Sequence, residues 1–207
     1  MDMSPSATRQ PKQARAIRTR ERILDRAEQA FADNGFEAAS LTSDILDPSG
    51  ISVGSFYHQF ADKRAVLHAL LDERRAWRDV SERLRSVTEQ QTTLSDAVRA
   101  GVIELFDAID EHPAPWHIHF RELQSADPEV RALIEHSWSV WIVAVTAVLQ
   151  RWADDTSPAT TGRLTFATLG LSGVLRSYLV GDAGARSQAR GASLDGVVAA
   201  CVASVTG

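Results

Sequence analysis

Residues 50–63 of the chain read Gly-Ile-Ser-Val-Gly-Ser-Phe-Tyr-His-Gln-Phe-Ala-Asp-Lys, and this stretch decides the predicted fold of the N-terminal region. Ser52 is a favoured helix N-cap, because its hydroxyl can accept a hydrogen bond from the free amides of the next turn. Gly50 can end the preceding helix with a positive φ angle. Asp62 is placed to cap a further helix that starts at Lys63. The stretch therefore predicts a very short helix between two capped turns.

The side chains of this short helix divide into a buried set and an exposed set. Val53, Phe56 and Phe60 fall near one face at helical spacing, and the two phenylalanines are predicted to be core. The polar and aromatic side chains between them face outward, and Gly54 leaves room for the backbone of another molecule to approach closely. This layout is typical of the recognition helix of a helix-turn-helix.

The same stretch resembles the recognition segment of the TetR family of bacterial transcriptional regulators, whose pattern is G-[VI]-S-x-G-[ST]-[LF]-Y-x-[HY]-F-x-[SDN]-K. Residues 50–63 align with that pattern without an insertion, and residues 17–71 resemble the DNA-binding domain of the family. Val53 departs from it, since the family often has Lys or Arg there. Arg64 stands where an acidic residue is usual. A cation at a helix start is disfavoured by up to about 1 kcal/mol, so an anionic partner is expected near Arg64.

The resemblance also implies which side chains meet double-stranded DNA. Ser55 and His58 are expected to face base edges in the major groove, and Val53 can lie against a thymine methyl group. The hydroxyl and cationic groups are expected to contact phosphates and set the register. The residues expected at the DNA are Arg15, Arg18, Arg20, Thr42, Ser43, Ser52, Val53, Gly54, Ser55, Tyr57, His58 and Lys63.

The composition is that of an ordinary globular chain, with 207 residues of which 44% are apolar and 24% charged. A net charge of −5 at first argues against a polyanion partner. The charge is unevenly distributed, however, because residues 1–20 carry five Arg or Lys side chains against Asp2 alone. Local asymmetry of this kind is what matters for binding nucleic acid. The basic arm is either a DNA contact or a solvated disordered tail.

Several other classes of protein are not indicated. No apolar run approaches the roughly 18 residues of a membrane span, and the N-terminus lacks the apolar segment of a secretory signal. The single cysteine, Cys201, cannot form an internal disulfide, so a cytoplasmic location is expected. No nucleophile elbow, phosphate loop or metalloprotease motif is found, so neither an enzyme nor a cofactor is expected.

Apolar residues recur at helical spacing along the chain, and no strand-like alternation of useful length interrupts them. The predicted class is all-α, with a three-helix helix-turn-helix domain linked by a long helix to a C-terminal helical domain for ligand binding and dimerisation. Pro48 is expected to stop the second helix early. The expected parts are a flexible basic arm at 1–16, the DNA-binding domain at 17–62, the connecting helix at 63–85 and the C-terminal domain at 86–207, which includes a loop at 181–192.

An unusual set of aromatic residues occupies the middle of the C-terminal domain. These residues can form a plain hydrophobic core, or they can line the pocket for a small apolar or amphipathic effector that the resemblance implies. The pocket candidates are Trp77, Phe106, Trp116, His119, Phe120, Trp138, Trp141 and Phe166. His112, His117 and His119 could also suggest zinc, but positions two apart on a helix face different ways, so no metal site is expected.

The last two long helices carry apolar residues on more than one face. Such a surplus is either core or an interface, and family members dimerise through their C-terminal helices. A monomer exposing these faces would carry an apolar patch too large for a typical soluble surface. The residues expected in a homodimer interface are Leu171, Leu175, Tyr178, Val198 and Val202.

These observations predict a ligand-responsive transcriptional regulator, most simply a repressor, that binds a palindromic operator as a homodimer and is released by a small effector. The alternative is a helical protein that binds a ligand or partner and whose DNA-binding domain is degenerate. Val53 and Pro48 favour that alternative, and the salt dependence of DNA affinity separates the two.

Overall fold

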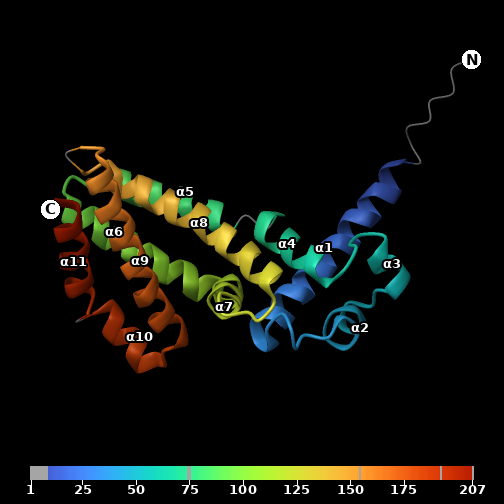
Figure 1. Cartoon of the computed structure of the whole chain (residues 1–207). Coiled ribbons are helices and arrows are strands. Elements are labelled where there is room, and N and C mark those ends of the chain that lie inside the picture. Colours follow the sequence, from blue (N-terminus) through green and yellow to red (C-terminus); the bar gives the residue numbers. More distant parts are fainter. Residues whose placement is uncertain (1–8, 74–75, 154, 192, 207) are drawn as a thin grey trace, which may run out of the picture.

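The computed structural model of the chain describes residues 9–73, 76–153, 155–191 and 193–206, and every regular element within them is a helix (Figure 1). The predicted all-α class is confirmed. In chain order the elements are α1 Arg9–Asn34, the π-helix η1 Leu41–Leu46, α2 Asp47–Ser49, α3 Val53–Tyr57, α4 Lys63–Glu73, α5 Ala76–Glu89, α6 Leu94–Glu111, α7 Pro113–Glu122, α8 Pro128–Gln150, α9 Pro158–Val180, α10 Ala183–Arg190 and α11 Leu194–Thr206.

Helix α1 begins at Arg9, earlier than the start predicted at Ile17. The residues added to it are mostly good helix formers such as Gln, Ala and Arg. Pro11 stands in the first turn, where its missing N–H removes no intrahelical hydrogen bond. The prediction of a flexible arm is therefore wrong from Arg9 onward, and residues 1–8 lie outside the described part of the chain.

Pro48 does not stop the second helix early, so that prediction is also wrong. Leu41–Leu46 winds as a π-helix, and Pro48 stands in the first turn of the short α segment that follows. A first turn has no intrahelical partner for the missing N–H of proline. Ser40 caps the π-helix by accepting from the Ser43 amide, and Gly50 ends α2 with a φ of 63°.

The first hydrophobic core lies between α1, η1, α3 and α4, where Phe31 and Phe56 have no exposed surface. Ile118 of α7 and Val130 and Ile134 of α8 belong to the same core. Figure 1 shows α7 and the start of α8 beside α1 and α4, in agreement with the contacts between these helices. The helix-turn-helix and the C-terminal helices therefore share one core rather than forming two independent bodies.

The second core lies between α5, α6, α8, α9 and α11, and helix α10 covers one end of it without burying a residue of its own. Polar contacts hold α10: the Arg186 and Arg190 guanidinium groups lie 3.2 and 2.7 Å from the Asp110 carboxylate. Arg190 Nε also donates to the Tyr178 hydroxyl at 2.7 Å. The loop predicted at 181–192 is thus largely a helix.

Helices α8 and α9 leave apolar side chains uncovered in a single chain. Val140 and Val143 of α8 are 56% and 69% exposed, and Phe166 and Val180 of α9 are 75% and 71% exposed. An 18-residue window of α8 has a mean hydropathy of 1.6, with 17% of it buried. By length and composition this helix could cross a membrane, which the sequence analysis did not anticipate, although one such helix is weak evidence for a span.

Candidate nucleic-acid interface

The caps predicted around the short helix α3 are present. Ser52 Oγ accepts from the Ser55 amide at 3.3 Å, and the two serine hydroxyls share a hydrogen bond of 2.9 Å. The Asp62 carboxylate accepts from the Ala65 amide at 2.7 Å and so caps α4. Phe56 anchors α3 to the first core with no exposed surface. These contacts fix a helix of five residues that would have little stability alone.

The outer face of α3 is open. Val53 and Tyr57 are 51% and 58% exposed, and Ser55 and His58 are also exposed. A Cβ atom added at Gly54 would meet nothing within 4 Å, so the backbone is uncovered there. The face offers hydroxyl and imidazole groups, an apolar contact and an accessible backbone, which is what a base-reading helix needs.

Hydroxyl and cationic groups predicted to contact phosphates lie on neighbouring elements. Thr42 and Ser43 are exposed on η1, where the Ser43 hydroxyl donates to the Asp44 carboxylate at 3.2 Å. Arg15 and Arg18 are exposed on α1. These positions leave the predicted phosphate contacts open for testing.

Arg20 has a structural partner that the sequence did not reveal. Its guanidinium donates to the Gln59 carbonyl at 3.1 Å and lies 4.2 Å from the centre of the Phe60 ring. It therefore ties α1 to the end of the recognition segment. Gln59 also departs from the family pattern, which has His or Tyr at that position.

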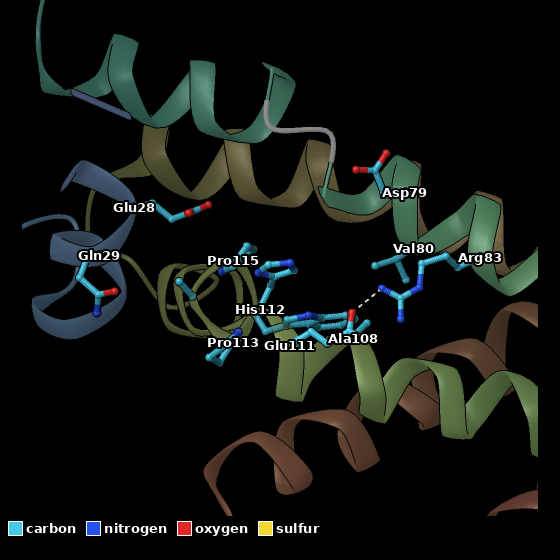
Figure 2. Close-up of a pocket in the computed structure, with 12 residues that line it drawn as sticks. Glu28, Gln29, Asp79, Val80, Arg83, Ala108, Glu111, His112, Pro113 and Pro115 are labelled. Carbon is cyan, nitrogen blue, oxygen red and sulfur yellow. Dashed lines mark hydrogen bonds and ion pairs between the residues drawn. The ribbon is translucent and has the colours of Figure 1, made fainter. Parts of the chain in front are cut away.

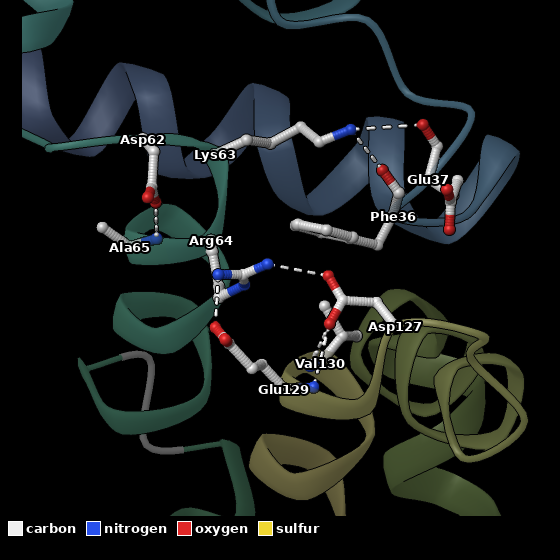
Figure 3. Close-up of polar contacts among 9 residues, drawn as sticks. All are labelled: Phe36, Glu37, Asp62, Lys63, Arg64, Ala65, Asp127, Glu129 and Val130. Carbon is white, nitrogen blue, oxygen red and sulfur yellow. Dashed lines mark hydrogen bonds and ion pairs between the residues drawn. The ribbon is translucent and has the colours of Figure 1, made fainter.

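Lys63 has structural partners that the sequence did not indicate. Its ammonium donates to the carbonyl oxygens of Phe36 and Glu37 at 2.5 and 3.3 Å (Figure 3). It also donates to the carbonyl oxygen of Ala39 at 2.9 Å. An ammonium has three N–H groups, so these contacts use all of them. Partial burial lowers the pKa of Lys63, against the opposing effect of Glu37 and Glu122. These contacts engage the ammonium within the protein while the side chain stays partly exposed, so the phosphate contact of Lys63 remains a prediction.

The anionic partner expected near Arg64 is found at the start of α8. The Arg64 guanidinium lies 2.8 Å from the Asp127 carboxylate and also contacts Glu129 (Figure 3). The hydrogen bond from Arg64 lowers the pKa of Asp127. Asp127 also caps α8 by accepting from the Glu129 amide at 2.9 Å. A single carboxylate thus links the helix after α3 to the C-terminal domain.

The predicted effector-site aromatics mostly pack on one another. Trp138 stacks on Trp141 and on His119, with ring centroids 4.3 and 4.2 Å apart, and Trp116 meets Trp141 edge-on. Phe120 meets Trp138 edge-on at 5.7 Å, so this group forms core rather than an open pocket.

Two other candidates, Phe106 and Phe166, lie apart from that aromatic group. Phe106 stacks on Tyr178 at 4.1 Å. Phe166 is exposed on the outside of α9, so its assignment to a pocket is wrong. The side chain of Trp77 lies outside the described part of the chain.

The structure does contain a cleft of about 520 Å³ where α1, α5, α6 and α7 meet, and Trp116 lines it. Figure 2 shows Glu28 of α1 and Asp79 of α5 above the junction of α6 and α7 at His112. In the wall of the cleft, the Arg83 guanidinium of α5 donates to the Glu111 carboxylate of α6 at 2.7 Å. This hydrogen bond lowers the pKa of Glu111. The cleft lies between the helix-turn-helix and the C-terminal helices. It is therefore a better candidate for an effector site than the packed aromatic group.

A second, smaller cavity of about 40 Å³ lies within the second core and is lined almost entirely by aliphatic side chains. Cys201 lines it, and burial raises the pKa of that thiol. A larger apolar ligand would enter only if the surrounding helices moved.

The histidines considered as metal ligands do not assemble into a site. Among the described residues, no group of three or more His, Cys, Asp or Glu side chains is placed to hold a metal ion. His119 is fully buried, and that burial lowers its pKa to about 3. The imidazole is therefore neutral near pH 7 and belongs to the aromatic core.

The residues predicted for a dimer interface are placed inside one chain. Leu171, Leu175, Tyr178 and Val198 are buried in the second core, and Val202 is partly buried against it. Side chains already covered within one chain are not available to a second copy, so this assignment is wrong for the four buried residues. The uncovered apolar surface consists instead of Val140, Val143, Phe166, Leu169 and Val180.

Comparison with known proteins agrees with this architecture. Residues 23–70 match the profile of the bacterial regulatory proteins, tetR family. The A-factor receptor protein of Streptomyces griseus is 42% identical over 62 residues, which are 30% of this chain and 22% of that protein. The transcriptional repressor AcnR of Corynebacterium efficiens is 27% identical over 143 residues, covering 67% of this chain and 68% of AcnR.

A solved structure extends the likeness to nearly the whole chain. FadR from Bacillus subtilis in complex with stearoyl-CoA has a TM-score of 0.63 and 16% identity, over 90% of this chain and 98% of that one. At such an identity the likeness concerns the fold. The profile match therefore assigns the helix-turn-helix at residues 23–70 to the bacterial regulatory proteins of the tetR family, and the rest of the chain shares the all-helical fold of the solved structures.

Proposed function

We propose that the chain is a transcriptional regulator that binds a palindromic DNA operator as a homodimer and releases it on binding a small amphipathic molecule. The observation that carries this proposal is the outer face of α3. Val53, Gly54, Ser55, Tyr57 and His58 are all exposed there, while Phe56 locks the helix to the core.

Dimerisation is supported by the uncovered apolar surface of α8 and α9. Phe166 and Leu169 stand on the exposed side of α9, and a Cβ added at Gly170 or Gly173 would meet nothing within 4 Å. Small residues beside large apolar ones permit two helices to pack closely. A two-fold pair would present two copies of α3 to one duplex, which is why a palindromic operator is expected.

Release by an amphipathic effector is supported by the cleft between the two parts of the molecule. Its wall combines carboxylates with Val80, Ala108 and Trp116, so it offers both polar and apolar contacts. FadR from Bacillus subtilis, which shares the fold, was solved with the amphipathic molecule stearoyl-CoA. An effector changes DNA affinity only if it binds the free and DNA-bound conformations unequally. We propose repression rather than activation, because the relative AcnR is a transcriptional repressor.

Selection of duplexes from a random pool by the full chain tests this function. Recovery of a two-fold symmetric sequence is expected, with affinity that falls steeply as salt rises because phosphate contacts release counterions. Failure to enrich any sequence, together with affinity that does not depend on salt, would favour the alternative of a degenerate DNA-binding domain. Val53 favours that alternative, because it supplies no positive charge at a position where the family often has Lys or Arg.

Replacing Gly54 with Ala separates folding from DNA binding. The added methyl group has no neighbour within 4 Å, and Ala is favoured over Gly in a helix by roughly 0.5–1 kcal/mol. The free energy of unfolding is therefore expected to stay level or rise. Affinity for the selected duplex is expected to fall about tenfold, or 1.4 kcal/mol, because the methyl group keeps the DNA backbone or bases away. Urea unfolding and fluorescence anisotropy measure the two quantities. Unchanged affinity would show that DNA does not approach this backbone.

A further inference from the structure

The backbone of Phe36, in the turn after α1, is held from two sides. Its N–H donates to the Glu122 carboxylate of α7 at 2.8 Å, and its carbonyl accepts from the Lys63 ammonium of α4 at 2.5 Å. The Phe36 ring lies beneath the same ammonium, 4.6 Å from it, and packs against Phe31 with ring centroids 5.3 Å apart. One residue therefore connects α7 with the helix that directly follows the recognition segment.

The contact between α7 and this turn is close and buried. Glu122 is 4% exposed, and the neighbouring Arg121 donates to the Asp33 carbonyl at 2.9 Å. Gly35 has a φ of 83°, and a Cβ added there would lie 3.1 Å from Arg121 Cδ and 3.2 Å from Glu122 Oε1. A movement of the end of α7 thus cannot leave the turn where it is.

The other side of the turn leads to the recognition helix. Lys63 is the first residue of α4, and its ammonium holds the carbonyl oxygens of residues 36, 37 and 39. The segment between Tyr57 and Lys63 is short and is itself tied to α1 by Arg20. A shift of the turn therefore acts on Lys63 and, through this short segment, on α3.

We propose that Glu122 and Lys63 are positioning residues that set the orientation of α3 through the turn at residues 35–39. Helix α7 begins at Pro113 in the wall of the cleft and ends at Glu122 on the turn. Its ten residues span about 15 Å as one rigid element. A ligand that binds in the cleft and moves the start of α7 therefore also moves Glu122 at its end, and with it the backbone of Phe36. The effect on operator affinity rests on the proposed function.

The first experiment needs no DNA and measures amide hydrogen exchange in the full chain. Glu122→Ala removes the acceptor of the buried Phe36 N–H, and exchange is expected to quicken about tenfold in residues 53–60 as well as in the turn. Lys63→Met is expected to do the same from the other side. The exposed carboxylate of Glu135 on α8 gives the matched control, so Glu135→Ala should leave these amides unchanged. Quickening confined to residues 35–39 would overturn the proposal.

The second experiment measures affinity for the selected duplex over a range of salt concentrations. Glu122→Ala and Lys63→Met are each expected to weaken binding about tenfold with no change in the slope of log affinity against log salt. Removing the Glu122 carboxylate reduces the electrostatic repulsion between the protein and DNA, which alone would strengthen binding. Weaker binding by Glu122→Ala therefore cannot be explained by the change in charge. The double variant is expected to lose little more than either single variant, because both act through Phe36.

Several outcomes would contradict the proposal. A salt slope reduced by about one in Lys63→Met would mean a direct phosphate contact. Fully additive losses in the double variant would mean that the two residues act separately. Glu122→Gln keeps an acceptor oxygen, so it should behave like the unmodified chain in both experiments, and it remains informative if Glu122→Ala fails to fold. A chain that binds no duplex would refute the proposed function, while the exchange experiment would still decide whether Glu122 positions α3.

Discussion

Replacing Phe166 with Glu is expected to abolish the proposed dimer and leave a monomer. Phe166 is 75% exposed on α9, and burying a Phe side chain in an interface contributes about 1.5–3 kcal/mol. A carboxylate at the same place would be desolvated without a partner, and two-fold symmetry makes the change occur twice. The dimer dissociation constant is therefore expected to rise at least about a thousandfold, or roughly 4 kcal/mol. Sedimentation velocity over a range of protein concentrations measures this constant.

Two control variants show whether the effect belongs to this surface. Phe166→Leu keeps an apolar side chain and should remain dimeric. Ile17 on α1 is 54% exposed, so Ile17→Glu introduces the same charge at a similar apolar position far along the chain and should not change the mass. Loss of the dimer should also reduce operator affinity by a factor of about 10² or more, because each half-site is then bound alone. A Phe166→Glu chain that stays dimeric would place the interface elsewhere.

Acidification is expected to destabilise the fold through His119 well above the pH at which carboxylates are protonated. In the unfolded chain this imidazole takes up a proton below about pH 6.5, whereas burial holds its folded pKa at about 3. The unfolded state therefore binds the extra proton between these values, and stability falls as pH falls through that window. One such group contributes a slope of up to about 1.4 kcal/mol per pH unit. The free energy of unfolding should be fully retained above pH 6.5.

Urea unfolding of the unmodified chain and of a His119→Gln variant between pH 6.5 and 5 isolates this contribution by difference. The carboxylate of Asp155, whose pKa hydrogen bonds from Thr160 and Ser157 lower to about 2, acts at lower pH. Burial also lowers the pKa of His117, followed by the effect of Arg121, so it adds a loss of the same sign. Gln does not titrate, so the free energy of unfolding of His119→Gln should depend less steeply on pH. The difference in slope should correspond to the uptake of about one proton on unfolding. Equal slopes for the variant and the unmodified chain would show that the folded protein accepts a charge at this site.

The recognition helix could be predicted because its determinants are local in sequence. Ser52 and Asp62 accept hydrogen bonds from amides within one turn, and Gly50 ends α2 through its positive φ angle. The spacing of Phe56 and Phe60 fixes which face is buried. The role of Lys63 could not be predicted, since its acceptors lie 24 to 27 residues earlier in the chain. Its position in the family pattern indicates a phosphate contact, and the tertiary structure adds three carbonyl partners.

The interface and the effector site were harder to predict for a related reason. Helix α9 carries apolar residues around its whole circumference, so periodicity does not distinguish Phe166, which is exposed, from Leu171, which is buried. The aromatic residues were numerous enough to fill the space between their helices, and they packed as core. The cleft is lined by a mixture of charged, Pro and apolar residues from four helices, and of the predicted pocket residues it contains Trp116. The sequence does not show which helices meet there.

Hydroxyl-radical footprinting of the chain with and without the selected duplex tests most directly whether α3 is the surface that meets DNA. Tyr57 is 58% exposed and reactive, whereas Trp116 is 2% exposed and serves as an internal reference. Binding is expected to slow oxidation of Tyr57 and His58 several-fold while Trp116 stays unchanged. Undiminished oxidation of both α3 side chains in a saturated complex would show that the duplex lies on another surface.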